Sequence, residues 1–229
     1  MKVLVSDYDK TFYVNEFDIR KNLQAVDKFR KLGNIFIIAT GRSYLDFKKK
    51  VNDYNLKYDY VLLNHGATIL DDKDNVLLNI PIDNLDLNIV NDLKLDKTIE
   101  HFCCSELESR VGFDYPNLTK IAVRYLPLVN IPKIKENLEK KYSNINAYLV
   151  SINMLEIISN KIDKSKSIEY LRNKLKIDKD DIYTVGDGET DIDMIKNYHG
   201  YAMNSSVKEL KKYAIEEIKS VSELINKII

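Results

Sequence analysis

The sequence predicts an α/β protein in which a doubly wound parallel sheet carries an inserted α+β domain. Two observations predict this fold. Short apolar runs alternate with stretches of helical spacing near both ends of the 229-residue chain, and between them a helix-strand-strand pattern occurs twice. Alternating strands and helices favour a parallel sheet with helices on both faces. We therefore expect residues 1–80 and 156–229 to form the discontinuous sheet domain and residues 81–155 to form the insert.

The first 80 residues contain three predicted buried strands, namely Lys2–Ser6, Ile35–Ala39 and Tyr60–Leu63. Apolar residues at helical spacing predict one helix at about 18–32, ended by Gly33, and another at about 44–51. The runs 67–70 and 76–80 flank a polar segment and predict a hairpin. This order is strand, helix, strand, helix, strand, hairpin.

The pattern changes after Pro81. A helix at about 85–95 precedes strands at 98–104 and 119–126, and a helix at 131–142 precedes strands at 146–151 and 154–158. From Asp163 the first pattern returns with a helix to Leu175, a strand at 182–185, a helix after Thr190 and a strand near 201–203. Ligands of doubly wound sheets bind beyond the carboxyl ends of the strands, and we expect the insert to lie over that edge.

Composition and charge exclude several classes of protein. Lys plus Arg and Asp plus Glu each number 35, so no overall positive field holds a nucleic acid or an anionic membrane. The amino terminus lacks the apolar core of a signal peptide, and no run of about 18 apolar residues occurs. The two cysteines, Cys103 and Cys104, are adjacent and build no disulfide framework, which predicts a reducing, cytoplasmic setting. With His101 they would offer a metal only three ligands. We therefore interpret these three residues as part of a strand whose side chains alternate between its two faces, and not as a metal site.

Acidic residues follow two of the predicted strands. Asp7 and Asp9 come after the first strand, and Asp187 and Asp191 follow the strand at 182–185. Carboxyl ends of parallel strands meet at one edge, so we expect these carboxylates to cluster. Two carboxylates about 4 Å apart repel by roughly 4 kcal/mol at an effective dielectric near 20, and oxygen ligands of high charge select Mg²⁺. Turn and helix-capping roles are the alternative for either segment alone.

These segments carry a family resemblance that spans nearly the whole chain. Asp7-Tyr8-Asp9-Lys10-Thr11, Thr40-Gly41-Arg42, a later lysine and Gly186-Asp187-Gly188-Glu189-Thr190-Asp191 resemble, in order, the four motifs of the haloacid dehalogenase superfamily. The Thr-Gly-Arg segment, Asn64-His65-Gly66-Ala67 and the Asp-Ile-Asp-Met run ending at Met194 are similar to the Cof-type sugar phosphatases of subfamily IIB. Relatives of that branch carry an α+β cap at the position of the insert.

The resemblance implies a magnesium-dependent phosphatase that acts on a small phosphorylated metabolite, such as a sugar phosphate, through an aspartyl phosphate. It implies that Asp7 is the nucleophile and that Asp9 is the general acid and base. An aspartate with an ordinary pKa of about 3.9 is already ionised and needs no histidine to activate it. The remaining implied ligands are Thr40, Gly41 and the lysine for the phosphoryl group, and Asp7, the Asp9 backbone carbonyl, Asp187 and Asp191 for Mg²⁺.

Two basic positions leave alternatives open. Lys164 and Lys166 both precede a helix, and the spacing from Lys164 to Ser167, Ile168 and Leu171 is more similar to the family pattern, so the resemblance implies Lys164 as the phosphate ligand. Arg42 either holds a substrate oxygen or caps a surface loop, and His65 is interpreted as a turn residue rather than a catalyst.

The sequence departs from the family pattern at three places. Lys10 stands where glycine is usual, Thr190 stands where asparagine is frequent, and Met203-Asn204-Ser205-Ser206 lacks the usual Gly-Asn-Ala. The first of these departures predicts an altered backbone turn.

Two other functions remain as alternatives. One is a phosphosugar mutase similar to the phosphomannomutases, and the other is a non-catalytic regulator that binds a phosphorylated metabolite. Specificity is expected from the insert, where Arg110, Lys120 and Arg124 are candidates to contact the leaving group, with solvated surface positions as the alternative.

Overall fold

The computed structural model describes residues 1–82, 87–105, 110–111 and 117–229. Its strands are β1 (Val3–Asp7), β2 (Ile35–Ala39), β3 (Tyr60–Leu63), β4 (Thr68–Asp71), β5 (Val76–Asn79), β6 (Ile99–Ser105), β7 (Arg110–Val111), β8 (Lys120–Tyr125), β9 (Ile145–Ser151), β10 (Met154–Ser159), β11 (Ile182–Gly186), β12 (His199–Met203) and β13 (Glu216–Ile218). Its helices are α1 (Glu16–Lys31), α2 (Tyr44–Tyr54), α3 (Leu87–Leu95), α4 (Ile131–Lys141), α5 (Lys164–Leu175), α6 (Ile192–Asn197), α7 (Lys208–Lys211) and α8 (Val221–Ile228), with short 3-10 turns η1 (Asn64–Gly66), η2 (Lys179–Asp181) and η3 (Glu189–Asp191).

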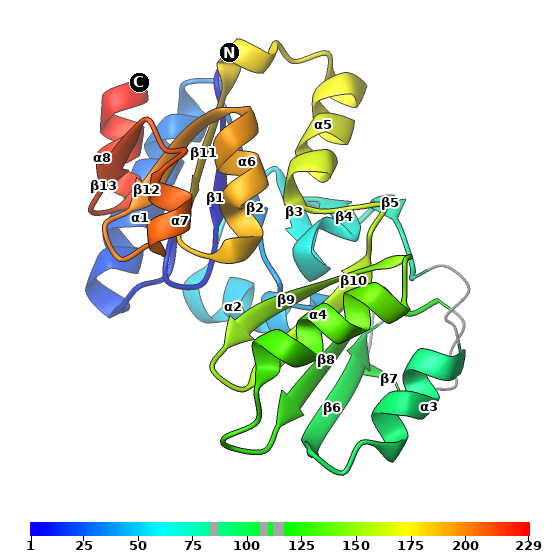
Figure 1. Cartoon of the computed structure of the whole chain (residues 1–229). Coiled ribbons are helices and arrows are strands. Elements are labelled where there is room, and N and C mark those ends of the chain that lie inside the picture. Colours follow the sequence, from blue (N-terminus) through cyan, green and yellow to red (C-terminus); the bar gives the residue numbers. More distant parts are fainter. Residues whose placement is uncertain (83–86, 106–109, 112–116) are drawn as a thin grey trace.

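The larger sheet has the strand order β13-β12-β11-β1-β2-β3-β4-β5. The strands from β13 to β3 pair in parallel, and β4 pairs antiparallel with both β3 and β5. This arrangement confirms the α/β fold with a parallel sheet that the alternation predicts. Because β1 is flanked by β2 and β11, the residues that follow these three strands meet at one edge (Figure 1).

Two apolar layers cover the faces of this sheet. One layer packs α1, α2 and α8 against side chains such as Leu4 and Phe36, and the other packs α5, α6 and α7 against side chains such as Val5 and Ile37. Successive residues of a buried strand point to opposite faces, so β1 is buried along its whole length and is apolar from Val3 to Val5, before Ser6 and Asp7 reach the carboxyl edge. Helix α1 begins at Glu16, two residues before the predicted start, because the Asn15 side chain accepts the N–H groups of the first turn and caps it.

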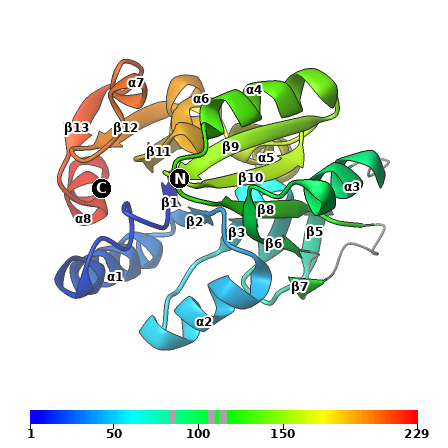
Figure 2. The same cartoon turned by 60° about the horizontal axis from the view of Figure 1, so that its bottom comes forward.

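The insert forms a second, antiparallel sheet in the order β7-β6-β8-β10-β9. Residues of β8 alternate between Ile121 and Val123, which pack against α3 and α4, and Lys120, which is on the opposite face. Strand β10 stays in this sheet as far as Ser159, four residues beyond the boundary expected at residue 155. Figures 1 and 2 show this sheet beyond the carboxyl ends of β1, β2 and β3.

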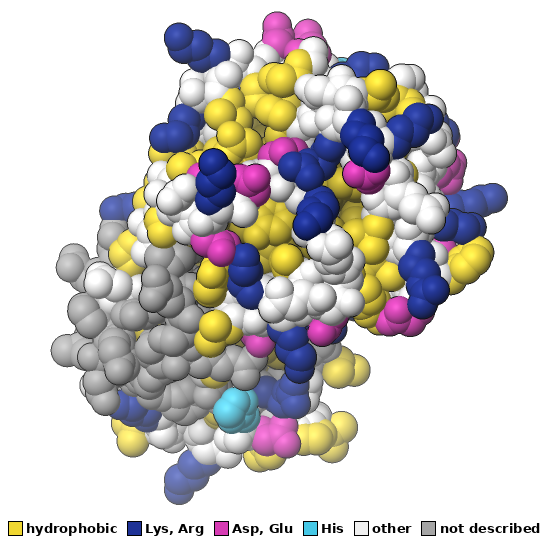
Figure 3. Space-filling view, turned by 180° about the vertical axis from the view of Figure 1, so that it is seen from behind, with side chains coloured by type: hydrophobic (Ala, Val, Ile, Leu, Met, Phe, Trp, Pro, Cys, Tyr) yellow, Lys and Arg dark blue, Asp and Glu magenta, His cyan; other side chains and the backbone are white. Residues whose placement is uncertain are grey.

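The surface mixes charges of both signs. On the face in Figure 3, the described Lys and Arg side chains lie among Asp and Glu and do not gather into one patch. Among the residues described, no helix combines the length and apolarity needed to cross a membrane.

Candidate active site

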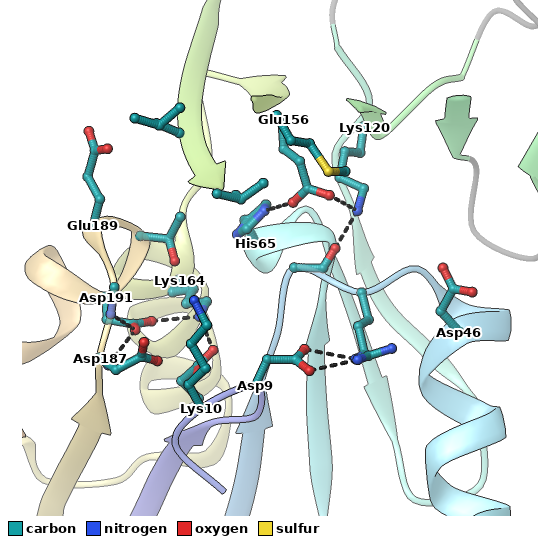
Figure 4. A pocket seen from close by; sticks show the side chains of 18 residues that line it. Asp9, Lys10, Asp46, His65, Lys120, Glu156, Lys164, Asp187, Glu189 and Asp191 are labelled. Atoms are coloured by element: carbon teal, nitrogen blue, oxygen red, sulfur yellow. Dashed lines mark hydrogen bonds and ion pairs between the residues drawn. The ribbon is translucent and has the colours of Figure 1, made fainter. Parts of the chain in front are cut away.

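A cavity of about 410 Å³ lies between the two sheets. Its floor consists of the loops that follow β1, β2, β3 and β11, and its roof comes from the cap strands (Figure 4). The lining residues are Asp7, Asp9, Lys10, Gly41, Arg42, Asp46, His65, Lys120, Leu149, Val150, Met154, Glu156, Lys164, Asp187, Gly188, Glu189, Thr190 and Asp191. The structure thus brings most of the sequence-predicted site residues to one cavity, and Thr40 is buried just beneath it.

Three carboxylates lie together on the floor. Asp7, Asp187 and Asp191 each offer an oxygen, and the three oxygens lie within 4.8 Å of one another. Burial raises the pKa of Asp7 well above 3.8, the neighbouring acids raise it further, and Lys164 opposes them. Burial and then Asp191 also raise the pKa of Asp187. A compact set of carboxylate oxygens with repelling charges fits a hard divalent cation such as Mg²⁺.

The two candidate lysines are placed very differently. Lys164 is 1% exposed, and its Nζ donates to Asp7 Oδ1 at 2.7 Å and to Asp191 Oδ1 at 2.6 Å. Its pKa rises because the two carboxylates outweigh the effect of burial. Lys166 points outward and donates to the carbonyl of Asn160 at 2.9 Å. Of the two lysines, the structure therefore brings only Lys164 to the acid cluster.

Asp191 has a second role in the loop after β11. Its Oδ2 accepts the N–H groups of Asp187 and Gly188, each at 3.0 Å. Asp187 is in turn held by the Thr11 hydroxyl, which donates to its Oδ1 at 2.9 Å. These bonds fix two of the three acids relative to each other.

Asp9 faces away from the acid cluster. Arg42 donates to both of its oxygens, from Nε at 2.8 Å and from Nη2 at 2.6 Å (Figure 4). Burial opposes the charge of Arg42, but the hydrogen bonds to Asp9 raise its pKa. Such a bidentate contact fixes the two side chains in one relative orientation. The sequence left a substrate contact and a loop cap open for Arg42, and in the structure its side chain pairs with Asp9, the other predicted catalytic residue.

Lys10, which stands where the family usually has glycine, adopts an unusual backbone conformation. Lys10 has a φ of 64°, in the left-handed region that glycine adopts without strain and other residues avoid. Its N–H donates to the carbonyl of Tyr13 at 2.8 Å. Lys10 thus occupies a backbone conformation that is strained for a residue with a side chain.

Three side chains at the cavity form a network in which Lys120, a predicted candidate to contact the leaving group, and His65, interpreted as a turn residue, meet Glu156, which the sequence did not single out. Glu156 of β10 contacts His65 and, at 2.8 Å, Lys120 of β8. Burial would raise the pKa of Glu156, but Lys120 and His65 outweigh it and lower the pKa to about 2. One acidic residue within the apolar strand Met154–Ser159 is the sequence signal that marked this position.

The other candidates from the insert do not reach the cavity or are not described. Arg124 is exposed and is not among the lining residues, and the side chain of Arg110 in β7 lies outside the described part. His101, Cys103 and Cys104 are strand residues of β6.

Comparison with known proteins gives consistent matches. A family model described as haloacid dehalogenase-like hydrolase matches residues 4–120 and 114–224. An uncharacterized protein of Mycoplasma capricolum is 30% identical, with 95% of this chain and 97% of that protein covered. A haloacid dehalogenase-like hydrolase from B. subtilis superposes with a TM-score of 0.84 at 16% identity, and the HAD subclass IIB sugar phosphatase BT4131 with a TM-score of 0.81 at 17% identity. Both matches cover 100% of each chain.

Proposed function

Because the chain belongs to the haloacid dehalogenase-like hydrolases, we propose that it is a magnesium-dependent phosphatase acting on a small phosphorylated metabolite through an aspartyl phosphate on Asp7. The resemblance seen in the sequence is confirmed by the family model and by the shared fold. The observation that carries the proposal is the buried contact of Lys164 with Asp7 and Asp191, open to a cavity. A cation beside a carboxylate nucleophile is the arrangement that receives a phosphoryl group.

The proposed reaction has two steps. The Asp7 carboxylate attacks phosphorus, the ester P–O bond breaks, and Asp9 gives a proton to the leaving alkoxide. Asp9 then takes a proton from a water molecule that attacks the aspartyl phosphate, which releases inorganic phosphate and restores Asp7. Lys164 and the Thr40 hydroxyl hold phosphoryl oxygens in both steps.

Proton transfer by Asp9 requires a rearrangement of its present contacts. In the structure both of its oxygens accept from Arg42, so the pair has to separate before Asp9 carries a proton. An incoming phosphate is a competing anion for the Arg42 guanidinium. We therefore assign Arg42 to substrate binding, with release of Asp9 as the consequence.

The proposed metal ligands are Asp7, Asp187, Asp191 and the backbone carbonyl of Asp9. When bound, Mg²⁺ supplies positive charge that offsets the acids and the phosphoryl oxygens. The cavity volume of about 410 Å³ suits a small metabolite, and its roof combines apolar Leu149, Val150 and Met154 with charged groups.

Phosphate release from p-nitrophenyl phosphate, with and without magnesium, tests the proposal. The natural protein should release phosphate only with magnesium, and Asp7→Asn should release none, because an amide of the same shape is no nucleophile. Circular dichroism of the variant serves as the control for folding. Substantial activity in Asp7→Asn, or equal activity without magnesium, would overturn the assignment.

A further inference from the structure

A buried network joins the cap to the loop that follows β2. Lys120 of the cap donates from Nζ to Glu156 Oε1 at 2.8 Å and to the carbonyl oxygen of Gly41 at 2.5 Å. The other Glu156 oxygen contacts Nε2 of His65 in the turn after β3. All three side chains lie at the boundary between cap and core, with 6%, 7% and 4% of Lys120, Glu156 and His65 exposed.

The protonation pattern of this network follows from its charges. The low pKa of Glu156 keeps it ionised, so both of its oxygens are acceptors. Burial lowers the pKa of His65, which leaves the ring neutral with its proton on Nε2, facing the carboxylate. Its Nδ1 is buried without a hydrogen-bond partner among the described residues. Glu156 therefore accepts from both neighbours and holds Lys120 in one position.

The three carbonyl oxygens of the Thr40–Arg42 segment are all tied to other parts of the protein. The Thr40 oxygen accepts the His65 N–H at 2.9 Å, and the Arg42 oxygen accepts the Asn64 N–H at 3.0 Å. Lys120 holds the oxygen between them, that of Gly41. Two of the three anchors thus come from the core, and the third comes from the cap.

Anchoring a carbonyl also directs the N–H group of the same peptide. The peptide unit is planar and trans, so its C=O and N–H point in opposite directions. With the Gly41 oxygen held by Lys120, the Arg42 N–H points the other way and donates to Thr40 Oγ1 at 3.1 Å. A hydroxyl that accepts this bond keeps its own hydrogen for another acceptor. The contact to Lys120 thereby orients the Thr40 hydroxyl.

The packing around Gly41 brings the loop after β2 into close contact with the His65–Glu156–Lys120 network. A Cβ atom at Gly41 would lie 2.5 Å from His65 Cε1, 2.7 Å from its Nε2 and 3.0 Å from Glu156 Oε2. The loop therefore approaches the network more closely than any side chain at this position permits.

We propose that Lys120, held by Glu156 and His65, is a positioning residue through which the cap orients the Thr40 hydroxyl toward the phosphoryl group. The proposal deepens the function proposed above and rests on it. It assigns to the cap a part in phosphate binding, in addition to enclosing the substrate. Lys120 acts through the Gly41–Arg42 peptide and not as a direct ligand.

The test is the affinity for inorganic phosphate with magnesium, measured by calorimetry, in a variant that carries both Lys120→Met and Glu156→Gln. Removing one partner alone leaves a buried, unpaired charge and risks unfolding, whereas removing both avoids it. The double change also leaves the net charge of the site unaltered. Lys135→Met is the matched control, because Lys135 makes a different cap–core ion pair, with Glu189.

We expect the double variant to bind phosphate about tenfold more weakly, the loss of roughly one hydrogen bond to a charged group, while Lys135→Met binds as the natural protein does. Introduced into Thr40→Val, the double change should weaken binding little further, because both changes affect the same hydroxyl. Natural affinity in the double variant, an equal loss in Lys135→Met, or additive losses with Thr40→Val would overturn the positioning role. If the natural protein neither binds phosphate nor hydrolyses a phosphate ester, the proposed function fails as well.

Discussion

Replacing Lys164 by methionine tests the electrostatics of the acid cluster most directly. The change keeps much of the side-chain length but removes the cation that contacts Asp7 and Asp191 at 2.7 and 2.6 Å. Breaking a buried ion pair by removing one partner costs about 3–5 kcal/mol. For a chain of this size each kcal/mol lowers the melting temperature by roughly 2–4 °C, so Lys164→Met should melt roughly 6–20 °C lower.

Lys166→Met is the matched control, since the same change two residues later removes a half-exposed lysine. Its Nζ lies 3.3 Å from Asp163, and exposed pairs of this kind contribute about 0–1 kcal/mol. Thermal unfolding without magnesium, followed by circular dichroism, gives the melting temperatures of both variants. Equal melting temperatures for Lys164→Met and Lys166→Met would refute the argument.

The pH dependence of stability provides an independent check that electrostatics cause the loss of stability in Lys164→Met. Burial raises the pKa of Asp7, and Lys164 opposes that rise, so the variant should have a still higher pKa there. A carboxyl whose folded-state pKa is raised favours folding below its unfolded pKa of about 3.8, and this contribution is lost as pH rises through the folded value. The stability gap between Lys164→Met and the natural protein should therefore narrow from about pH 8 to about pH 5. A gap independent of pH would indicate lost packing instead.

Three further changes probe other parts of the site. Asp187→Asn should raise the magnesium concentration needed for half-maximal activity by about tenfold or more, and an unchanged magnesium titration would remove Asp187 from the metal site. Gly41→Ala should lower kcat/KM strongly, since its Cβ would lie 2.5 Å from His65 Cε1, and full activity would contradict the close approach. Glu156, with its pKa lowered to about 2, stabilises the fold above about pH 4.5 and loses this contribution as pH falls toward 2, so acid unfolding of Glu156→Gln should show a shallower pH dependence. Identical acid unfolding curves would show that the low pKa has no part in stability.

Local sequence patterns predicted much of the fold. Buried strands such as Ile35–Ala39 are continuous apolar runs, and helices such as α1 repeat apolar residues at helical spacing, so both can be predicted without knowledge of their neighbours. The order of these elements then predicts a parallel sheet, whose carboxyl edge collects the acids. Strand β13 was not predicted, because its residues Glu216 and Glu217 are exposed and it exists through pairing with β12.

The sequence by itself determined the residue types of the site and the strands that present them. Similarity to the family pattern favoured Lys164 over Lys166, but only the tertiary structure shows one lysine buried between two carboxylates and the other directed outward. The sequence also did not predict the partners of Arg42 and Glu156, because these partners lie 33 and as many as 91 residues away along the chain. Periodicity predicts which face of an element is buried, whereas contacts between distant side chains depend on the order of the strands in the larger sheet and, for Glu156, on how the two sheets are placed against each other.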